Sequence, residues 1–399
     1  GSTSEEYVAD ALLDFADFYL LTRQWKGSLR QMRHAEPVFE GTPRFEFMRI
    51  RALTSLLLAD SADVLVGSLA GRHKTELPWL LGFIRHFIDR GAADSARAYL
   101  DLALEVAEAD FGVLLAHVEL AQLGGDSLEY RRALEDLVEA HPRDLRSLRL
   151  LAAYHNAGGR PALALDLADR MIEYYPGNLS SYQFAARVAT REDGSAAGLR
   201  YLRLAAKNNP ELPAIYHMLS VSFLRDGLSD SVENYVNRSL ELDPDYIPSR
   251  LSRGLFLESQ GKTDSAIAIY RGVIERDPFS AEAFNNLAWV MASNDIDPAA
   301  AANHAREAIS LSGGVKANMH GTLGWAYFKQ KRYKFANVAY LRAIQMDPGD
   351  PFKRYLIGIN LESLGKNDEA LRELRTALDL GIQGTYRQLT EQAVARLGG

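Results

Sequence analysis

Proline recurs at a fixed spacing through the middle of this chain, and few folds are compatible with such regularity. The spacing is 34 residues, at Pro142, Pro176, Pro210, Pro244 and Pro278. Repetition with a period of roughly 20 to 50 residues is the signature of solenoid arrays, in which each repeat buries its apolar face by stacking on its neighbours. We therefore interpret most of the 399 residues as one repeat array rather than as two or three globular domains.

Each repeat is expected to contain two helices. If the prolines are assigned position 32, repeats begin at Phe111, Leu145, Leu179, Pro213, Ile247 and Ala281. Position 8 then carries a small side chain, which lets two helices approach closely, at Ala152, Ala186, Ser220, Gly254 and Ala288. Glycine at position 15, as in Gly159 and Gly261, suits the end of a helix that needs a positive φ. The order within a repeat is thus helix, glycine turn, helix and proline stop.

The same frame extends in both directions, giving about eleven repeats between Ala9 and Gly384. A last helix is expected from Thr385, which forms a capping pair with Gln388, and it would cover the apolar face of the final repeat. Gly1 and Ser2 are typical of a cloning scar, ahead of which a signal peptide or lipid anchor would have been removed. We divide the chain into a scar and leader (1–8), degenerate N-terminal repeats (9–110), regular repeats (111–280), C-terminal repeats (281–384) and a capping helix (385–399).

The recurring small residue at position 8, alanine at position 20 in Ala164 and Ala266, and proline at position 32 together resemble the tetratricopeptide repeat family over nearly the whole chain. The resemblance implies an all-α fold, a right-handed superhelical solenoid of helix pairs whose first helices line a concave groove. Residues 285–289, 322–327 and 355–358 are also similar to bacterial envelope proteins that assist exopolysaccharide export. That similarity implies a periplasmic or envelope-associated location.

Composition and motifs exclude several classes of function. The net charge of −7 and the pI near 5.8 argue against a nucleic-acid-binding surface over the whole protein. The longest apolar run, near residues 53–59, is far shorter than the ~20 residues of a membrane span. No cysteine is present, and no phosphate-binding loop, zinc-protease motif or nucleophile elbow occurs. We predict no catalytic residue, metal site or cofactor, and we interpret the isolated His217 and His320 as structural.

Groove residues are expected at positions 2, 5, 9, 12 and 13 of each first helix, and they fall into two sets. The basic set, in the middle of the chain, comprises Arg146, Arg149, Gln183, Arg187, Arg191 and Arg225. The apolar set, toward the C-terminus, comprises Val221, Leu255, Asn285, Trp289, Trp325, Phe328, Tyr355 and Ile359.

Both sets also admit a structural interpretation. Arginines on helices often only solvate a surface or pair with acids, and apolar groove residues can pack between tightly wound helices. The functional hypothesis is a non-enzymatic scaffold that binds protein or peptide partners in its groove, in an assembly for envelope polysaccharide synthesis or export. The alternative is direct binding of a polysaccharide or another anionic polymer. Pockets spaced along a chain would favour a peptide, whereas flat exposed rings flanked by polar groups would favour a sugar.

Overall fold

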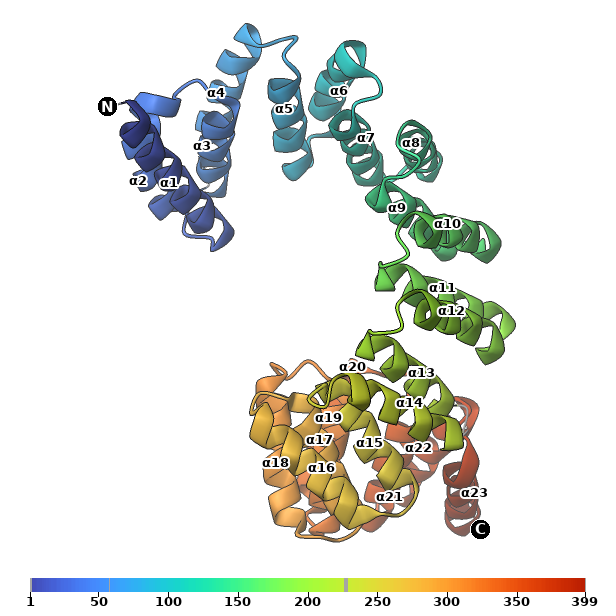
Figure 1. Cartoon of the computed structure of the whole chain (residues 1–399). Coiled ribbons are helices and arrows are strands. Elements are labelled where there is room, and N and C mark those ends of the chain that lie inside the picture. Colours follow the sequence, from blue (N-terminus) through green and yellow to red (C-terminus); the bar gives the residue numbers. More distant parts are fainter. Residues whose placement is uncertain (1, 57, 226–228, 399) are drawn as a thin grey trace. The chain divides into compact units, whose positions relative to one another are not determined.

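The computed structural model describes residues 2–56, 58–225 and 229–398. Over these residues the chain forms 23 α-helices and no strand (Figure 1). It separates into two compact units, Gly1–Glu192, called unit 1, and Asp193–Gly399, called unit 2. None of the described helices is long and apolar enough to span a membrane. The predicted all-α solenoid is confirmed: helix pairs follow one another from α1 to α22, and a single helix, α23, ends the chain.

Unit 1 holds the degenerate repeats and the first regular ones. Its helices are α1 (Ser2–Leu21), α2 (Trp25–Phe39), α3 (Pro43–Ser55), α4 (Ala59–Arg72), α5 (Leu77–Asp89), α6 (Ala93–Ala107), α7 (Phe111–Gly124), α8 (Ser127–Ala140), α9 (Leu145–Ala157), α10 (Pro161–Tyr174) and α11 (Leu179–Asp193). The first helix begins at Ser2 and so includes most of the segment assigned to the scar and leader. Residues 2–9 contain no glycine or proline that would end a helix, so the helix of the first repeat continues through them.

Unit 2 holds the remaining repeats. Its helices are α12 (Ser195–Asn208), α13 (Pro213–Arg225), α14 (Ser229–Leu242), α15 (Ile247–Ser259), α16 (Thr263–Arg276), α17 (Ala281–Ser293), α18 (Pro298–Leu311), α19 (Ala317–Lys329), α20 (Tyr333–Met346), α21 (Pro351–Ser363), α22 (Asn367–Asp379) and α23 (Gly384–Gly398). The division between the units falls inside the sixth repeat, at none of the boundaries drawn from the sequence. Those boundaries followed the regularity of the repeats, whereas the units reflect which helices contact one another.

From α7 to α17 the first helices begin at the residues that the proline frame predicts, and α19 and α21 begin two residues later than the 34-residue period would put them. Side-chain caps mark several of these starts. The Asp144 carboxylate accepts a hydrogen bond from the Ser147 backbone N–H at 2.8 Å, and Asp350 accepts one from Phe352 N–H at 2.8 Å. Such side chains satisfy backbone donors that have no partner in the first turn of a helix. Where such caps occur they define the first residue of the helix, whereas α15 and α19 begin without a side-chain cap.

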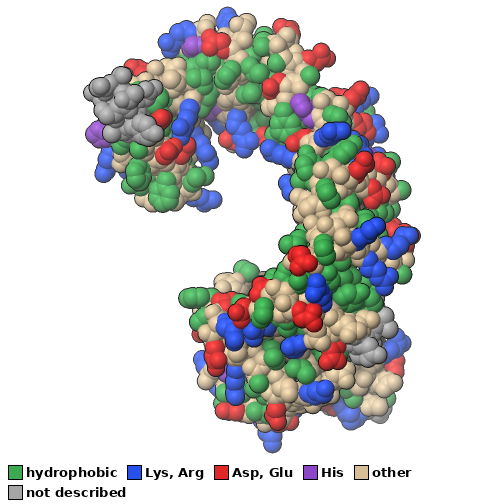
Figure 2. Space-filling model, viewed as in Figure 1, with side chains coloured by type: hydrophobic (Ala, Val, Ile, Leu, Met, Phe, Trp, Pro, Cys, Tyr) green, Lys and Arg blue, Asp and Glu red, His purple; other side chains and the backbone are tan. Residues whose placement is uncertain are grey.

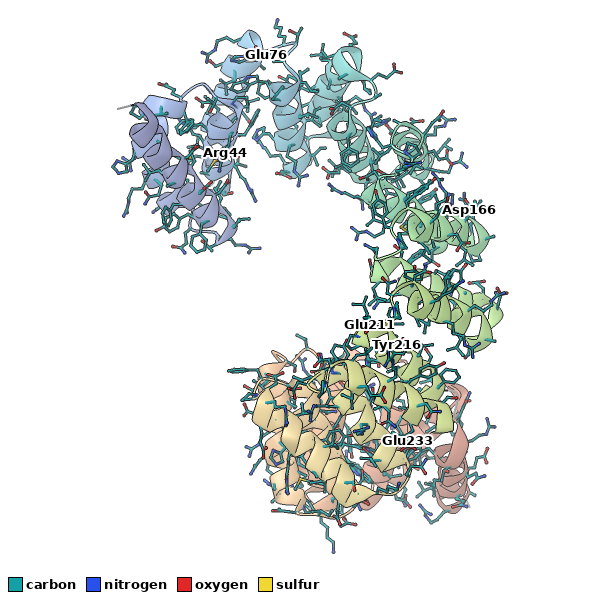
Figure 3. The ribbon with its side chains drawn as sticks, in the orientation of Figure 1. Arg44, Glu76, Asp166, Glu211, Tyr216 and Glu233 are labelled. Atoms are coloured by element: carbon teal, nitrogen blue, oxygen red, sulfur yellow. The ribbon has the colours of Figure 1, made fainter. Side chains whose placement is uncertain are left out.

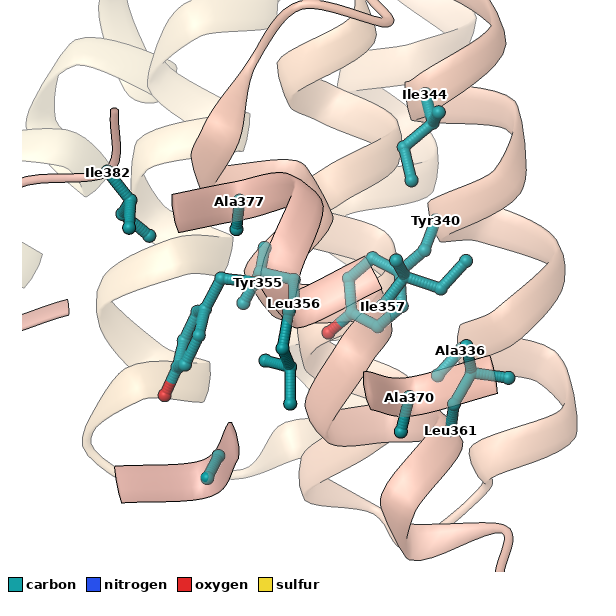
Figure 4. Close-up of a cluster of buried hydrophobic side chains, with 12 residues drawn as sticks. Ala336, Tyr340, Ile344, Tyr355, Leu356, Ile357, Leu361, Ala370, Ala377 and Ile382 are labelled. Atoms are coloured by element: carbon teal, nitrogen blue, oxygen red, sulfur yellow. The ribbon is translucent and has the colours of Figure 1, made fainter. Parts of the chain in front are cut away.

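The small residue at position 8 packs against a bulky residue at position 24 of the same repeat. A Cβ atom added to Gly324 would lie 2.5 Å from Cε1 of Tyr340, whose side chain is completely buried. The same close approach joins Gly254 to Tyr270, and Gly358 to Leu374. Figure 4 shows Tyr340 within the buried cluster that α20, α21 and α22 build at the C-terminal end of unit 2. Glycine is needed at these positions because the aromatic ring or leucine occupies the space of a side chain.

The terminal helix α23 covers this last cluster. Ala393 is buried within it, and Val394 and Leu397 pack against it. Tyr386 and Leu389, which the sequence pattern placed on the same covered face, remain exposed. The buried face of α23 is therefore centred further along the helix than expected, and Tyr386 is free to take part in the surface described below.

Candidate functional site

In each unit, the first helices of successive pairs contact one another. These contacts join α1 to α3, α3 to α5 and α5 to α7 in unit 1, and they run from α13 through α15, α17, α19 and α21 to α23 in unit 2. We call the face that the first helices form the inner side of a unit. The pockets described below are lined by residues of these helices or of the turns beside them, so the inner side is where a ligand would be held.

An aromatic row crosses the inner side of unit 2. Its members are Phe328, Trp325, Trp289, Phe352, Tyr386 and Tyr355, from α17, α19, α21 and α23. Trp325 stacks on Phe328 with ring centroids 5.2 Å apart and on Trp289 at 6.1 Å. Trp289 meets Phe352 edge to face at 5.9 Å, and Phe352 meets Tyr386 at 4.7 Å. Offset and edge-to-face pairs at these spacings are mutually attractive, so the row has a fixed shape before any partner binds.

Two pockets lie along this row and share Trp289 and Phe352. The first, about 210 Å³, is lined by Asn285, Trp289, Asn318, Gly321, Thr322, Asp350, Phe352, Lys353 and Leu356. The second, about 440 Å³, is lined by Trp289, Pro351, Phe352, Gly381, Ile382, Gln383 and Tyr386. Gly321, at position 5 of α19, lines the first pocket, and a Cβ atom added there would meet nothing within 4 Å.

Asn285 supplies an unsatisfied acceptor at the first pocket. Its side chain is 7% exposed, and its Nδ2 donates to Asn286 Oδ1 at 3.3 Å. Its Oδ1 is buried and has no hydrogen-bond partner among the described residues. A buried polar atom without a partner costs roughly 1–3 kcal/mol, so such atoms in native proteins need an explanation. A ligand that donates a hydrogen bond to Asn285 Oδ1 in the pocket would provide such an explanation.

Glu258 places a carboxylate beside the same row. The Tyr270 hydroxyl donates to its Oε2 at 3.5 Å, and the Trp289 ring N–H also donates to it. Burial raises the pKa of Glu258, and these two donors only partly offset the effect. Burial likewise raises the pKa of Tyr386, and the charge of Glu258 raises it further, so the two groups lie near each other. Trp289 is thus held by aromatic contacts on its ring and by a hydrogen bond at its nitrogen.

The predicted apolar set separates into two parts. Trp289, Trp325, Phe328 and Tyr355 come together in the aromatic row, and Asn285 lines the first pocket. Ile359 packs partly buried against the C-terminal core cluster. Val221 and Leu255 are exposed, at 46% and 39%, and line neither pocket. The apolar set therefore has an aromatic centre, and Val221 and Leu255 are exposed aliphatic side chains outside it.

Two members of the apolar set also serve the core. Trp325 packs against the buried clusters on both sides of α19, and its ring N–H donates to Ser293 Oγ at 3.1 Å. Tyr355 is itself buried within the C-terminal cluster (Figure 4). Truncating either side chain would loosen packing as well as alter the surface, so Asn285 and Gly321 are better probes of the site.

Sequence reasoning counted Phe352 among the aromatic residues of the groove, but it left out Tyr386, Gly321 and Lys353. Phe352 and Tyr386 occupy position 2 of successive frames, so extending the period into the terminal helix would have identified Tyr386. Lys353 is buried and held by Asp350 and by Asp347, the latter at 2.8 Å. No sequence signal marks Gly321, because an absent side chain becomes a pocket only when its neighbours are known.

The described side chains of the predicted basic set lie exposed on α9 and α11 of unit 1. Figure 2 shows Lys and Arg side chains along the inner rim of this unit. Arg146 pairs with Glu119 at 3.8 Å, Arg191 binds Glu192 and Asn156 at 2.8 Å each, and Arg187 lies over the Phe184 ring. Arg149 and Gln183 are exposed on the same two helices. The side chain of Arg225 lies outside the described residues.

The histidines interpreted as structural have local partners. His217 Nδ1 lies 3.1 Å from Ser252 Oγ, and burial lowers its pKa. His320 Nε2 lies 3.2 Å from the Gly314 carbonyl oxygen. In the part of the chain that the structure describes, no three His, Asp or Glu side chains gather closely enough to hold a metal ion.

Comparison with known proteins agrees with this architecture. Tetratricopeptide repeat models match residues 119–178, 251–309 and 317–350. Two solved structures are similar along almost the whole chain. The structure of the APC/C hetero-tetramer Cut9-Hcn1 has a TM-score of 0.52 and 14% identity, covering 98% of this chain and 96% of that chain. Yeast Tom70 has a TM-score of 0.50 and 13% identity, covering 99% of this chain and 96% of that chain. At these identities the likeness shows the fold alone.

Proposed function

We propose that this chain is a non-catalytic scaffold whose unit 2 binds an extended segment of a protein partner along the aromatic row. The helical-repeat fold generally mediates protein–protein interaction. The observation that carries the proposal is the buried Oδ1 of Asn285, which lacks a partner among the described residues and lines a pocket walled by Trp289 and Phe352. An extended peptide offers backbone N–H groups to such an acceptor and apolar side chains to such a wall.

The shape of the two pockets favours a peptide over a sugar chain. Trp289 and Phe352 separate the pockets, so two side chains can insert on either side of one aromatic wall. The first pocket, at about 210 Å³, is smaller than the ~300–1,000 Å³ typical of small-molecule sites, which suits a single side chain. A sugar ring instead stacks on an open ring face, whereas the Trp325 ring already stacks on Phe328 and Trp289 and has the Lys329 ammonium over it.

Filling the first pocket tests the proposal. Gly321→Leu should place a side chain in the space that a partner side chain would occupy, without displacing any atom at Cβ. The matched control is Gly71→Leu on α4 in unit 1, where a Cβ atom also meets nothing within 4 Å and no described pocket is near. Both changes replace a helical glycine by a better helix former, so neither should lower helix content. Partners captured from the native source and quantified by mass spectrometry should be lost with Gly321→Leu and kept with Gly71→Leu. Equal capture by both would remove the proposed site.

Asn285→Leu separates binding from stability. The change removes a buried unsatisfied acceptor, so the free energy of unfolding should stay the same or rise. Binding of a captured partner, measured by calorimetry, should weaken by about three- to tenfold, because a net hydrogen bond contributes roughly 0.5–1.5 kcal/mol. Unaltered affinity would show that Asn285 does not contact the partner.

We place this scaffold in a bacterial envelope assembly for polysaccharide synthesis or export, on the resemblance of residues 285–289, 322–327 and 355–358. All of these residues belong to α17, α19 and α21, three of the four helices that carry the aromatic row. Capture of subunits of a polysaccharide synthase or exporter by the wild-type chain would support this setting. Glycan binding that depends on Trp289, with no protein captured, would favour the polymer-binding alternative.

A further inference from the structure

A separate pocket on the inner side of unit 1 has a different chemistry. Its volume is about 560 Å³, and its lining comes from α1, α3 and α5: Asp17, Leu20, Arg44, Phe47, Met48, Ile50, Arg51, Thr54, Ser55, Gly82, Arg85, His86 and Asp89. Three arginines therefore enter one pocket whose remaining wall is part apolar and part polar. None of them belongs to the basic set that the sequence predicted on α9 and α11.

Acidic neighbours already neutralise two of these arginines. Arg44 lies on the side of α3 that faces α1, where it binds Asp14 at 2.7 Å and Asp17 at 3.2 Å (Figure 3). The hydrogen bond to Asp14 raises the pKa of Arg44. Arg85 binds Asp89 at 3.1 Å and Glu119, one repeat further on, at 2.7 Å.

Arg51 has no such neighbour. Its side chain is exposed, and among the described residues none forms an ion pair or hydrogen bond with it. The reason lies in the repeat: Asp17, Arg51 and Arg85 occupy position 9 of three successive first helices. Asp17 on one side is occupied by Arg44, and Arg85 on the other side carries the same charge as Arg51. His86 adds no charge at neutral pH, because burial lowers its pKa.

We propose that this pocket binds one carboxylate of a protein partner, an aspartate or glutamate next to an apolar residue, with Arg51 as the recognising group. A guanidinium presents a planar fork of donors that matches both oxygens of a carboxylate. Leu20, Phe47 and Met48 supply an apolar surface for the neighbouring residue. Asp17 and Asp89 line the same pocket and repel additional negative charge, so a single carboxylate is accepted and a polyanion is disfavoured.

This site goes beyond the function proposed for unit 2. It lies in the other unit and uses an ion pair rather than an aromatic wall. The Arg51 variants leave every residue of unit 2 in place, so the two proposals can fail separately.

A library of random 12-residue peptides, displayed on phage and selected on the full chain, tests the inference. Selection is run in parallel on the wild type, on Arg51→Glu and on Arg132→Glu. The peptides recovered on the wild type and on Arg132→Glu but lost on Arg51→Glu should carry an acidic residue beside an apolar one. Arg132 is the matched control, since it is an exposed arginine on α8 that lines no described pocket. Arg51→Gln serves as the neutral variant, and equal thermal melting of all variants checks that the fold is kept.

A synthetic peptide from this selection should bind Arg51→Glu at least tenfold more weakly than the wild type, and Arg51→Lys should bind it at an intermediate level. Replacing the acidic residue of the peptide by arginine should restore binding to Arg51→Glu. The inference is wrong if no selected peptide depends on Arg51, or if the dependent peptides carry no acidic residue. It is also wrong if heparin, as a probe polyanion, binds through Arg51 more tightly than these peptides.

Discussion

Replacing Gly324 by alanine should destabilise unit 2, whereas the same replacement at Gly321 on the same helix should stabilise it. Both glycines lie within α19 and neither has a positive φ. They differ in what a new Cβ atom would meet. At Gly324 it would lie 2.5–3.0 Å from three atoms of the Tyr340 ring, and at Gly321 it would meet nothing within 4 Å.

The size of the difference follows from two opposing contributions. Alanine is better than glycine in a helix interior by about 1 kcal/mol, and both variants gain this. Gly324→Ala also overpacks the core, which costs roughly 1–3 kcal/mol, since Tyr340 is completely buried and has no space into which to move. The two variants should therefore differ by about 1–3 kcal/mol in free energy of unfolding, with Gly321→Ala the more stable.

Hydrogen exchange of the α19 and α20 amides measures the local difference in stability between the two variants. Urea unfolding followed by circular dichroism measures the free energy of unfolding for the whole chain. A second substitution provides the control. Tyr340→Ala should cost several kcal/mol alone but less in the Gly324→Ala background, because the added methyl group then fills part of the cavity. If the two alanine variants are equally stable, the packing of position 8 on position 24 is not what requires glycine there.

Three further results are expected. Glu258→Gln should stabilise the chain at pH 7 to 8 and have no such effect below pH 4.5. The reason is that burial raises the pKa of Glu258 in the folded chain above its ordinary value of 4.5. Such a carboxyl contributes stability at low pH, and this contribution is lost as the pH rises through the folded pKa. Fluorescence of Trp289, which donates to this carboxylate, should titrate above pH 4.5 in the wild type and not in the variant, and a midpoint at 4.5 would contradict the assignment. Deleting residues 384–399 should expose the C-terminal cluster and produce oligomers in light-scattering measurements; a stable monomer would mean that α23 is not a cap. Reversing Arg149 and Arg187 to glutamate should abolish any salt-sensitive binding of an anionic partner to unit 1, and an unchanged salt dependence would exclude this part of the basic set.

Local features of the sequence predicted the fold because they are repeated. The proline period located the first residue of the first helices from α7 to α17, and the small residue at position 8 marked where two helices approach closely. The first helix was placed less well: its start lies at Ser2 rather than Ala9, because without a glycine or proline the sequence shows no boundary there.

The candidate sites depended on contacts that no single repeat encodes. Trp289 and Trp325 could be assigned to the inner side from their position in the frame, but the contact of Trp289 with Phe352 crosses a whole repeat and depends on how the helix pairs stack. Whether Arg51 is paired depends on which neighbour Asp17 prefers, and Arg44 takes it.

The sequence by itself determined the helix pairs, their starts and the face that each first helix turns inward, because capping, glycine tolerance and side-chain volume act within about 34 residues. Only the tertiary structure decided where the chain separates into two units, which aromatic rings meet on the inner side of unit 2, and which arginine in unit 1 is left without a partner. These outcomes depend on the distance between side chains two or more helices apart, and that distance is set by how the pairs stack rather than by the residues of any one pair.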